Sequence, residues 1–403
     1  MTGIIETERA RDILLSHIKP VDECETLRPS AAYGRVCAED VYSPINAPSF
    51  NRSAMDGYAV RAEDTKGASE DCPVTLDVTG ELCAGDFRDI TYAPHTAVRV
   101  MTGACIPDGY DCVVMQEDTD YGEDKVRIFR TAKPYMNYCP VGEEFSEGAL
   151  LIKKGTRIGR VEIFLLNSAG LTEIKAVRRP LVSVYSTGSE LVRAGAELKK
   201  GQIYNGLESM LCASLQGIGL LKADSNSCSD DKDDIAENIH AGLSCSDMVI
   251  TTGGVSVGKK DLLPDVLSDM GAEILFHGTA IQPGTPTMAA VLDGKVILSL
   301  SGNPFAALAN FDYYMPYIAA KLTGCTAFLT EEKTAVLADH YTKVNRLRRL
   351  VRARYEAGRV YLPTDRHFSS VVGNLTQCNC YIDIPKETPL SVGDTVNIRM
   401  MRN

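Results

Sequence analysis

The hydrophobic pattern changes several times along the chain, and each change predicts a different kind of element. Residues 4–18 repeat apolar side chains at helical spacing until Pro20, which predicts an amphipathic helix. Short alternating runs between residues 46 and 139, separated by Gly and Pro, predict a small β domain. Residues 140–176 return to a helical pattern that stops at Gly170, and we expect this piece to pack back on the N-terminal helix.

Residues 178–326 follow a different pattern, in which an apolar strand leads into a loop rich in Gly, Ser and Thr and then into a helical segment. The pattern occurs three times, as LVSVY before STGSEL, MVI before TTGGVSVG and KVILSL before SGNP. Strands that alternate with helices predict a parallel sheet with right-handed crossovers, so the three loops should gather at its carboxyl edge. Alternation returns after about residue 327 and predicts a separate small β-barrel or sandwich. The predicted fold class is therefore multidomain α/β plus β.

Composition excludes some classes of protein. The net charge of −11 argues against a general nucleic-acid binder, since proteins that follow phosphates usually carry a basic surface. The first fifteen residues lack the features of a secretion signal, and residues 301–320 fall short of a membrane span because proline and polar side chains interrupt them. Thirteen cysteines without a CxxC pair fit a reducing cytosol better than a disulfide framework. We therefore expect a cytoplasmic protein without a membrane or nucleic-acid partner.

Two features leave alternatives open. Cys378 and Cys380 could hold a metal, although a strand with two unrelated thiols is the simpler interpretation. Residues 341–366 hold eight basic and two acidic side chains, so this segment is +6 while the remainder of the chain is −17. The segment is either a solvated strand face with alternate arginines or a binding surface for a phosphorylated ligand or acidic partner.

The three strand-end loops have the chemistry of an anion site. Their backbone N–H groups and hydroxyls lie where helix N-termini begin, which is how α/β sheets bind phosphates. They do not form a Walker loop, because GGVSVGKKD lacks its spacing. Tight turns are the alternative interpretation, which is easier to accept for one loop than for three at one edge. Five glycines would allow close approach of the backbone to the ligand: Gly188, Gly253, Gly254, Gly258 and Gly302.

Acidic residues accompany these loops, with Glu190 just after STGS and Asp261 just after SVGKK. A carboxylate repels a phosphate unless a divalent cation lies between them, so the pairing suggests Mg²⁺ bound by oxygen ligands. A surface acid is the alternative for either residue alone. Six scattered histidines without an HExxH pattern make a zinc site improbable. In the β region, SAMDGYAV and MTGACIPDGYDCVVMQED read as ordinary hairpins by composition.

Taken together, the chain resembles the MoeA family of molybdopterin molybdenumtransferases, which is related to the C-terminal domain of gephyrin. The segments SAMDGYAV, MTG with VVMQED, STGSEL with GQIYNG, TTGGVSVGKKD, QPGTP and SGNP carry the resemblance over essentially the whole chain. It implies an elongated bipartite domain (1–45 plus 140–177), a β domain (46–139), a three-layer molybdopterin-binding α/β domain with a parallel-rich sheet (178–326) and a C-terminal β-barrel (327–403). It also implies a homodimer, with the active site between the α/β domain of one subunit and the β domain of the other.

The resemblance implies a reaction as well. Adenylylated molybdopterin and molybdate bind together, the phosphoanhydride is hydrolysed with the help of Mg²⁺, molybdenum enters the dithiolene and AMP leaves. A molybdopterin adenylyltransferase is the implied source of the substrate. The implied catalytic residues are Asp56, Thr102, Glu190 and Asp261, with Glu190 and Asp261 also at the metal. The implied substrate-binding residues are Ser53, Glu144, Thr187, Gly188, Ser189, Gly253, Gly254, Ser256, Gly258, Gln282, Pro283, Gly284, Pro286, Gly302, Asn303 and Pro304.

Several positions depart from the family pattern, and two of the departures remove positive charge. Gln282 stands where relatives usually have lysine, and Cys139 to Val141 replace a run that usually contains arginine. These changes predict weak oxyanion binding, which the basic segment 341–366 could offset. Smaller departures are Asn51 and Ser301 for the usual Asp and Pro, Ala306 for Ser, and Glu144 in the place of an Asp.

Three functions fit this sequence. An enzyme that inserts molybdenum or tungsten into molybdopterin is favoured. A molybdopterin adenylyltransferase shares the α/β domain, but it usually lacks the β domains and has TTGGTG where this chain has TTGGVSVG. A catalytically degenerate paralogue, which carries cofactor or acts as a dimeric scaffold, is favoured by the missing basic residues and opposed by the retained acids.

Overall fold

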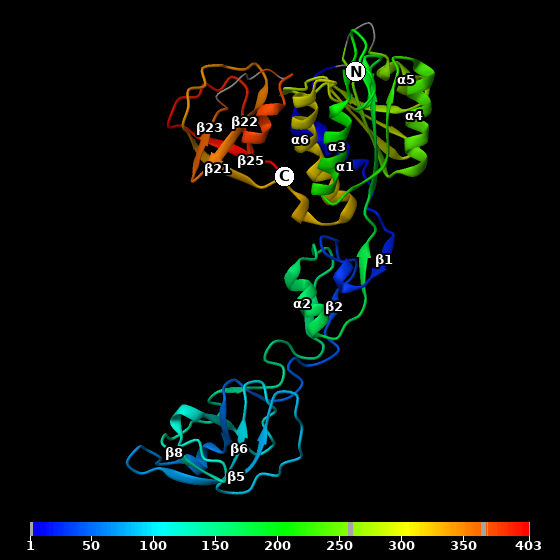
Figure 1. The fold of residues 1–403 in the computed structure, drawn as a ribbon. Helices are drawn as coiled ribbons and strands as arrows, with labels where there is room; N and C mark the ends of the chain where they lie inside the picture. Colours follow the sequence, from blue (N-terminus) through cyan, green and yellow to red (C-terminus); the bar gives the residue numbers. More distant parts are fainter. Residues whose placement is uncertain (1–2, 257–260, 364–367, 369, 403) are drawn as a thin grey trace.

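The computed structural model describes residues 3–256, 261–363, 368 and 370–402, and the molecule is elongated (Figure 1). A β domain forms one end, while an α/β domain and a β-barrel lie side by side at the other end. A smaller body that contains α2 and β1 joins the two ends. The chain starts at the α/β end, crosses to the β domain and returns, so the joining body is built from two stretches distant in sequence.

Five strands form the sheet of the β domain in the order β7-β4-β6-β5-β8. Its strand pairs are antiparallel except β5 with β6. Exposed and buried residues alternate along β8, as expected for a sheet with one face on a core. A separate short pair joins β3 to β9. The elements are β3 (Arg52–Ser53), β4 (Gly57–Val60), η2 (Ala62–Thr65), β5 (Val74–Leu82), β6 (Thr96–Val100), β7 (Cys112–Met115), η3 (Gln116–Asp118), β8 (Lys125–Ile128) and β9 (Tyr138–Cys139).

The joining body has a small core of its own, in which Ile152, Leu166 and Ile174 are buried. Two antiparallel strand pairs hold its two stretches of chain together, β1 with β11 and β2 with β10. The helix α2 lies over this core and contacts η1 and β10. The elements are β1 (Cys24–Leu27), η1 (Pro29–Ala31), β2 (Val41–Tyr42), β10 (Leu150–Ile152), α2 (Arg160–Ser168) and β11 (Ile174–Val177).

The α/β domain has a six-stranded sheet in the order β15-β12-β16-β20-β19-β17. The four strands β15, β12, β16 and β20 are parallel, whereas β19 and β17 run antiparallel at one edge. The parallel part was expected from the repeated strand-loop-helix pattern, and the antiparallel edge was not. The strands are β12 (Leu181–Thr187), β15 (Leu221–Cys228), β16 (Met248–Thr252), β17 (Glu273–His277), β19 (Met288–Leu292) and β20 (Lys295–Leu300), with a separate pair, β13 (Leu191–Val192) and β14 (Ile203–Tyr204).

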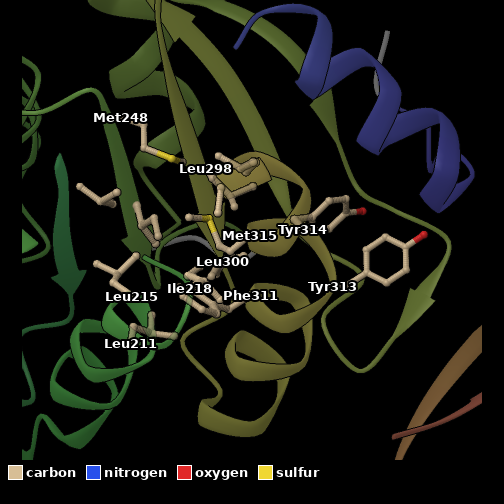
Figure 2. Close-up of a cluster of buried hydrophobic side chains, with 14 of the residues drawn as sticks. Leu211, Leu215, Ile218, Met248, Leu298, Leu300, Phe311, Tyr313, Tyr314 and Met315 are labelled. Atoms are coloured by element: carbon tan, nitrogen blue, oxygen red, sulfur yellow. The ribbon is translucent and has the colours of Figure 1, made fainter. Parts of the chain in front are cut away.

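Helices cover both faces of this sheet, which gives three layers. One face packs against α1 (Thr7–Ser16), α3 (Gly206–Gly217) and α6 (Pro304–Thr323), and Figure 2 shows side chains of α3 and α6 meeting those of β16 and β20. The other face packs against α4 (Lys232–Cys245) and α5 (Leu263–Asp269). Burial of both faces explains why these strands read as continuous apolar runs.

The N-terminal helix α1 does not pack on α2, contrary to expectation. Its apolar side chains Ala10 and Leu14 belong to the core of the α/β domain, and α1 contacts α6 and β17. The helix α2 lies in the joining body instead (Figure 1). The helical periodicity located both helices but carried no information about which partner each apolar face would meet.

The C-terminal residues form a β-barrel, because the strand order β22-β23-β21-β25-β24 closes through a pairing of β22 with β24. A short strand of the α/β domain, β18 (Ile281–Gln282), adds to β22 in parallel. The basic segment is only partly solvated, since Arg354 on β22 is exposed while Arg352 is buried. The other elements are η4 (Thr326–Phe328), β21 (Glu332–Leu337), β22 (Arg348–Glu356), β23 (Arg359–Tyr361), η5 (Gly373–Gln377), β24 (Cys380–Ile384) and β25 (Thr395–Met400).

The structure bears on three expectations, which concern membrane spans, the neighbouring cysteines Cys378 and Cys380, and metal sites. No helix in the described part of the chain is long and apolar enough to cross a membrane. Cys378 and Cys380 are buried free thiols, and their sulfur atoms donate to the carbonyls of Asn374 and Ala353. Among the described residues, no group of three or more His, Cys, Asp or Glu side chains is arranged to hold a metal ion.

A half-buried carboxyl group, that of Asp312, lies where α6 packs against the barrel. The Tyr381 hydroxyl donates to Asp312 at 2.6 Å. Burial raises the pKa of Asp312 to about 7, although the bond from Tyr381 and the nearby charge of Arg399 act in the opposite direction. The carboxyl group is therefore largely protonated in the folded chain at pH values where it would be ionised in the unfolded chain.

This raised pKa predicts a specific pH dependence of stability. The stabilisation from the protonated Asp312 is fully present below the unfolded pKa near 4 and is lost as pH rises through about 7. Between pH 5 and pH 8, the free energy of unfolding of the original chain should therefore fall. In Asp312→Asn, we expect this fall to be about 2 kcal/mol smaller. Urea unfolding at both pH values measures this, with the exposed Asp71→Asn as control. Parallel pH dependences in all three proteins would contradict the assignment.

Candidate active site

The carboxyl ends of β12, β16 and β20 lie next to one another, and the three predicted loops follow them. A cavity of about 360 Å³ opens at this edge. The helices α3 and α6 both begin at the cavity, so two helix N-termini with their positive dipole ends face it. The lining residues are Thr187, Glu190, Leu191, Ile203, Tyr204, Asn205, Gly206, Leu207, Met210, Thr252, Gly302, Pro304 and Val372.

The three loops are packed so closely that the second requires glycine and the third leaves little room for a side chain. A Cβ atom at Gly253 would lie 2.5 Å from the Thr187 carbonyl oxygen, and the backbone there has a φ of +85°. A Cβ atom at Gly302 would lie 3.3 Å from the Gly253 Cα atom. The Thr187 hydroxyl donates to the Thr252 carbonyl oxygen at 3.2 Å, which joins the first loop to the second. The loops therefore form one continuous floor for the cavity.

Glu190 is the acidic residue of this cavity. Its carboxylate lies over Gly188, where a Cβ atom would stand 2.7 Å from Oε1. The side chain is exposed, while the backbone carbonyl oxygen accepts a hydrogen bond from the Ile203 amide at 2.9 Å. The neighbouring Ser189 hydroxyl donates to Asp230 at 3.0 Å. Of the predicted residues, Glu190 thus brings a carboxylate into the loop floor.

One wall of the cavity was not among the predicted site residues. Ile203, Tyr204 and Asn205 belong to it, and Asn205 caps α3 by accepting from the Glu208 amide at 3.2 Å. The Asn205 amide group also donates to the Ser227 hydroxyl at 2.9 Å, which ties the cap to β15. An asparagine just before a glycine and a helical run signals such a cap. The GQIYNG segment therefore carried the information, but it was used only for the resemblance.

The remaining predicted α/β residues lie around the loops without lining this cavity. Asn303 caps α6 by accepting from the Ala306 amide at 3.4 Å. The Gly254 carbonyl oxygen accepts from the Leu263 amide at 3.2 Å, which joins the second loop to α5. Ser256 ends the described part of that loop and Asp261 begins the next described part, two residues before α5. Gly258 lies outside the described residues.

A second cavity, of about 620 Å³, lies between the QPGTP turn and the barrel. We call it the basic cavity, because Lys343, Arg346 and Arg349 line it together with Gln282. The turn is fixed by the buried Asn310, whose amide group donates to the Pro283 carbonyl oxygen at 2.8 Å. The predicted residues Gln282, Pro283, Gly284 and Pro286 thus share one cavity with part of the basic segment, and the other lining residues are Thr285, Phe305, Val344, Asn345 and Phe368.

Asp56 and Thr102 meet on the β domain. The Thr102 amide and hydroxyl both donate to Asp56 Oδ1 at 2.7 Å. The hydroxyl bond and then the amide bond lower the pKa of Asp56, so its carboxylate is ionised at neutral pH. The predicted residue Ser53 lies beside them, with its carbonyl oxygen accepting from the Gly103 amide at 2.8 Å. Glu144 is exposed, and its amide donates to the Ala47 carbonyl oxygen at 2.9 Å.

One chain does not bring all the predicted catalytic residues together. Asp56 and Thr102 belong to the β domain, and Glu190 belongs to the α/β domain at the opposite end of the elongated molecule (Figure 1). The connection between them runs through the joining body. A site that uses both groups needs a second copy of the chain.

Comparison with known proteins identifies the family of the chain. Residues 5–170 match the MoeA N-terminal region (domain I and II), residues 183–320 match a probable molybdopterin binding domain and residues 334–400 match the MoeA C-terminal region (domain IV). A molybdopterin molybdenumtransferase of Staphylococcus epidermidis is 36% identical over 390 residues, which is 96% of this chain and 93% of the relative. The chain belongs to the MoeA family. A relative of the same name from Staphylococcus aureus is 33% identical over 377 residues, 93% of this chain and 90% of the relative.

Solved structures agree with the sequence relatives. A molybdopterin biosynthesis MoeA protein from Pyrococcus horikoshii is 31% identical, has a TM-score of 0.86 and covers 99% of both chains. The predicted fold class and family are therefore confirmed. The chain is a transferase of molybdenum cofactor biosynthesis with a molybdopterin-related substrate. The degenerate paralogue and the adenylyltransferase are not favoured. The predicted domain boundaries and the roles of the site residues stay predictions.

Proposed function

We propose that the protein inserts molybdenum from molybdate into adenylylated molybdopterin, with hydrolysis of the phosphoanhydride and release of AMP. The observation that carries this proposal is the cavity at the ends of β12, β16 and β20, where Glu190 lies above a floor of backbone and hydroxyl groups. Two helix N-termini and close-packed glycine loops suit an anionic phosphate. The apolar wall with Ile203 and Tyr204 suits a flat heterocycle, since binding cavities combine apolar walls with a few polar groups.

The residues at this cavity fit a Mg²⁺ ion that is held partly by the substrate phosphate and by water. A fully protein-bound metal ion would need three or more ligands, and no such group exists among the described residues. Mg²⁺ bound to nucleotides usually keeps several waters and takes one or two carboxylates plus phosphate oxygens. Glu190 lines the cavity and would be one of those carboxylates, and the family resemblance assigns Asp261, which follows the second loop, as the other. When bound, the ion would neutralise phosphate charge that the two carboxylates otherwise repel.

The other groups would bind and orient the substrate. The loop amides and the N-termini of α3 and α6 would hold phosphate oxygens as fixed donors, which need no reorganisation during the reaction. Asp56, kept ionised by its two bonds from Thr102, would add a carboxylate from the β domain. Since Asp56 and Glu190 lie at opposite ends of one chain, we place the complete site between two subunits of a homodimer.

The basic cavity is the proposed place of the oxyanion. Gln282 replaces a cation there, but Lys343, Arg346 and Arg349 line the same cavity. A buried or half-buried arginine offers two N–H groups to a tetrahedral anion, and such charge-assisted bonds are strong. The Arg349 guanidinium is already oriented, because it donates to Asn345 Oδ1 at 3.2 Å. The predicted weakness of oxyanion binding thus depends on how far these three residues replace the missing lysine.

Removal of Arg349 should weaken this site selectively. We expect Arg349→Gln to raise the KM for molybdate about tenfold, the usual effect of losing one hydrogen bond to a charged group. The KM for adenylylated molybdopterin should stay nearly constant. Arg359→Gln is the control, since Arg359 is an exposed member of the basic segment on β23 outside the cavity. Equal changes in the two variants would place the oxyanion elsewhere.

The direct test of the proposed reaction measures the release of AMP. Purified protein with Mg²⁺ and adenylylated molybdopterin should release AMP only when molybdate is present. Substitution of tungstate in the same assay shows which oxyanion is used. Tight pterin binding without AMP release would contradict the proposal and would favour a cofactor carrier. Supply of the pterin by a molybdopterin adenylyltransferase and a cytoplasmic location remain predictions from the sequence.

A further inference from the structure

The part of the β domain that carries Asp56 is strongly acidic. We call it the β-domain tip and define it as residues 51–56, 102–105 and 137–144. Hydrogen bonds hold these three segments side by side, from the Gly103 amide to the Ser53 carbonyl oxygen and from the Ala54 amide to the Asn137 carbonyl oxygen. Asp56 and Glu143 at the tip are exposed, and Glu144 is exposed next to Glu143. A phosphorylated substrate that meets this surface meets three carboxylates and needs a cation.

Arg52 lies in the middle segment of the tip. Its backbone pairs with Cys139 of β9 on one side and with Cys105 on the other. Residues that pair directly across two strands project to the same face, so the side chains of Arg52 and Cys139 lie on one face of the β3–β9 pair. Arg52 is exposed, whereas Cys139 is buried.

Two hydrogen bonds orient the Arg52 guanidinium. Its Nε–H group donates to the Cys139 sulfur at 3.2 Å, and the Cys139 thiol donates in turn to Glu143 Oε2. Burial raises the pKa of the Cys139 thiol, and so does its bond to Glu143, although the Arg52 bond acts in the opposite direction. The thiol therefore stays protonated and can donate. The chain of bonds fixes one edge of the guanidinium through Nε.

The other edge of the guanidinium is open. Within the described part of the chain, the two terminal nitrogens of Arg52 have no hydrogen-bond or ion-pair partner. The bond to Cys139, followed by the charges of Glu143 and Glu144, raises the pKa of Arg52. A permanent cation with two parallel N–H groups directed outward matches two oxygens of a phosphate or of another tetrahedral oxyanion.

We propose that Arg52 is a substrate-binding residue, whose terminal N–H groups contact a tetrahedral oxyanion of the substrate when the tip meets the Glu190 cavity of a second subunit. The inference rests on the proposed function, because it uses the dimeric site. Residues 139–141 contain no basic side chain, and Arg52 places a cation directly opposite Cys139. The oxyanion is either a phosphate of the adenylylated pterin or the molybdate itself.

A structural role for Arg52 predicts something different. If its hydrogen bond to Cys139 only joined β3 to β9, then Arg52→Lys would be as harmful as Arg52→Gln, since neither retains the Nε–H group in place. Both variants would lose thermal stability, and substrate affinity would follow stability. A binding role requires the positive charge and spares the fold, since the side chain is exposed.

The test measures binding and turnover in the intact homodimer. Isothermal titration with adenylylated molybdopterin and, separately, with molybdate gives Kd values that do not depend on catalysis. We expect Arg52→Gln to raise the Kd and KM for one of these ligands about tenfold with kcat within twofold, because it removes a contact made equally in ground and transition states. The ligand that is affected identifies the oxyanion. Arg52→Lys should retain most of the affinity, and Arg127→Gln on β8 is the exposed control.

An exchange of the two paired residues adds a sharper test. In the double variant Arg52→Cys with Cys139→Arg, the cation moves to the facing position on the same side of the β3–β9 pair. We expect affinity within about threefold of the original protein, against the tenfold loss in Arg52→Gln. Unchanged Kd values in Arg52→Gln, or equal losses in the Gln and Lys variants, would overturn the proposal. Failure of the wild-type protein to release AMP would overturn the proposed function, while the Kd values would still decide the role of Arg52.

Discussion

Glu190→Gln should abolish molybdate-dependent AMP release. The substitution keeps the size of the side chain over Gly188 but removes the charge that Mg²⁺ requires, while the loop floor stays intact. A loss of one metal-binding carboxylate at a phosphoryl site removes electrostatic stabilisation of the transition state, and we expect kcat to fall about a hundred- to a thousandfold. Single-turnover release of AMP, followed by chromatography at saturating Mg²⁺, measures the effect.

The matched control is Glu197→Gln, an exposed glutamate in the segment after β13 that does not line the cavity. Binding of adenylylated molybdopterin by Glu190→Gln should be weakened only modestly, because the amides and helix N-termini remain. Retention of more than a tenth of the original kcat would show that Glu190 is not a metal ligand in the reaction. Recovery of the rate at high Mg²⁺ concentration would instead support a role in metal affinity.

A mixture of two inactive variants should recover activity. Asp56→Asn removes the carboxylate of the β-domain tip, and Glu190→Gln removes that of the cavity. If each site takes Asp56 from one subunit and Glu190 from the other, a heterodimer of the two variants contains one intact site. Random exchange of subunits should then restore about a quarter of the wild-type activity, since half of the dimers carry one good site of two.

This recovery would be absent if both groups acted within one subunit or in separate reactions. Co-expression of the two variants with different affinity tags allows the heterodimer to be isolated and assayed directly. The double variant Asp56→Asn with Glu190→Gln, mixed with wild type, is the control for simple dilution. Its heterodimer carries no intact site, because each site lacks one of the two carboxylates. Among the isolated heterodimers, activity in the wild-type/double-variant pair together with none in the pair of single variants would place the complete site within a single chain.

The fold was largely predictable, because most of its elements bury one face or both. Alternation in the β domain and in the tail followed from sheets with one face on a core, and the apolar runs of β12, β16 and β20 followed from a sheet covered on both sides. It was harder to predict which elements distant in sequence pack against each other. The apolar stripe of α1 fits any hydrophobic surface, and only the tertiary structure shows that α6 and β17 receive it. The antiparallel edge β17–β19 was missed because pairing direction leaves little trace in hydrophobicity.

The site was predictable where backbone chemistry leaves a strong signature. Gly253 was singled out as a place of close approach, and its neighbour proves to be the Thr187 carbonyl oxygen. Side chains from distant segments were not predictable in the same way. The association of Gln282 with Lys343, Arg346 and Arg349 depends on how the barrel docks on the α/β domain, which no local pattern specifies. Arg52 was overlooked for the same reason, since its significance lies in the residue opposite it on another strand.

The parallel pairing of β18 with β22 makes the α/β domain and the barrel mechanically continuous. Backbone hydrogen bonds cross from Ile281 and Gln282 to Arg348 and Arg349, and the Tyr381–Asp312 bond adds a partly buried side-chain link. The barrel therefore cannot swing away as a lid over the basic cavity without breaking a ladder.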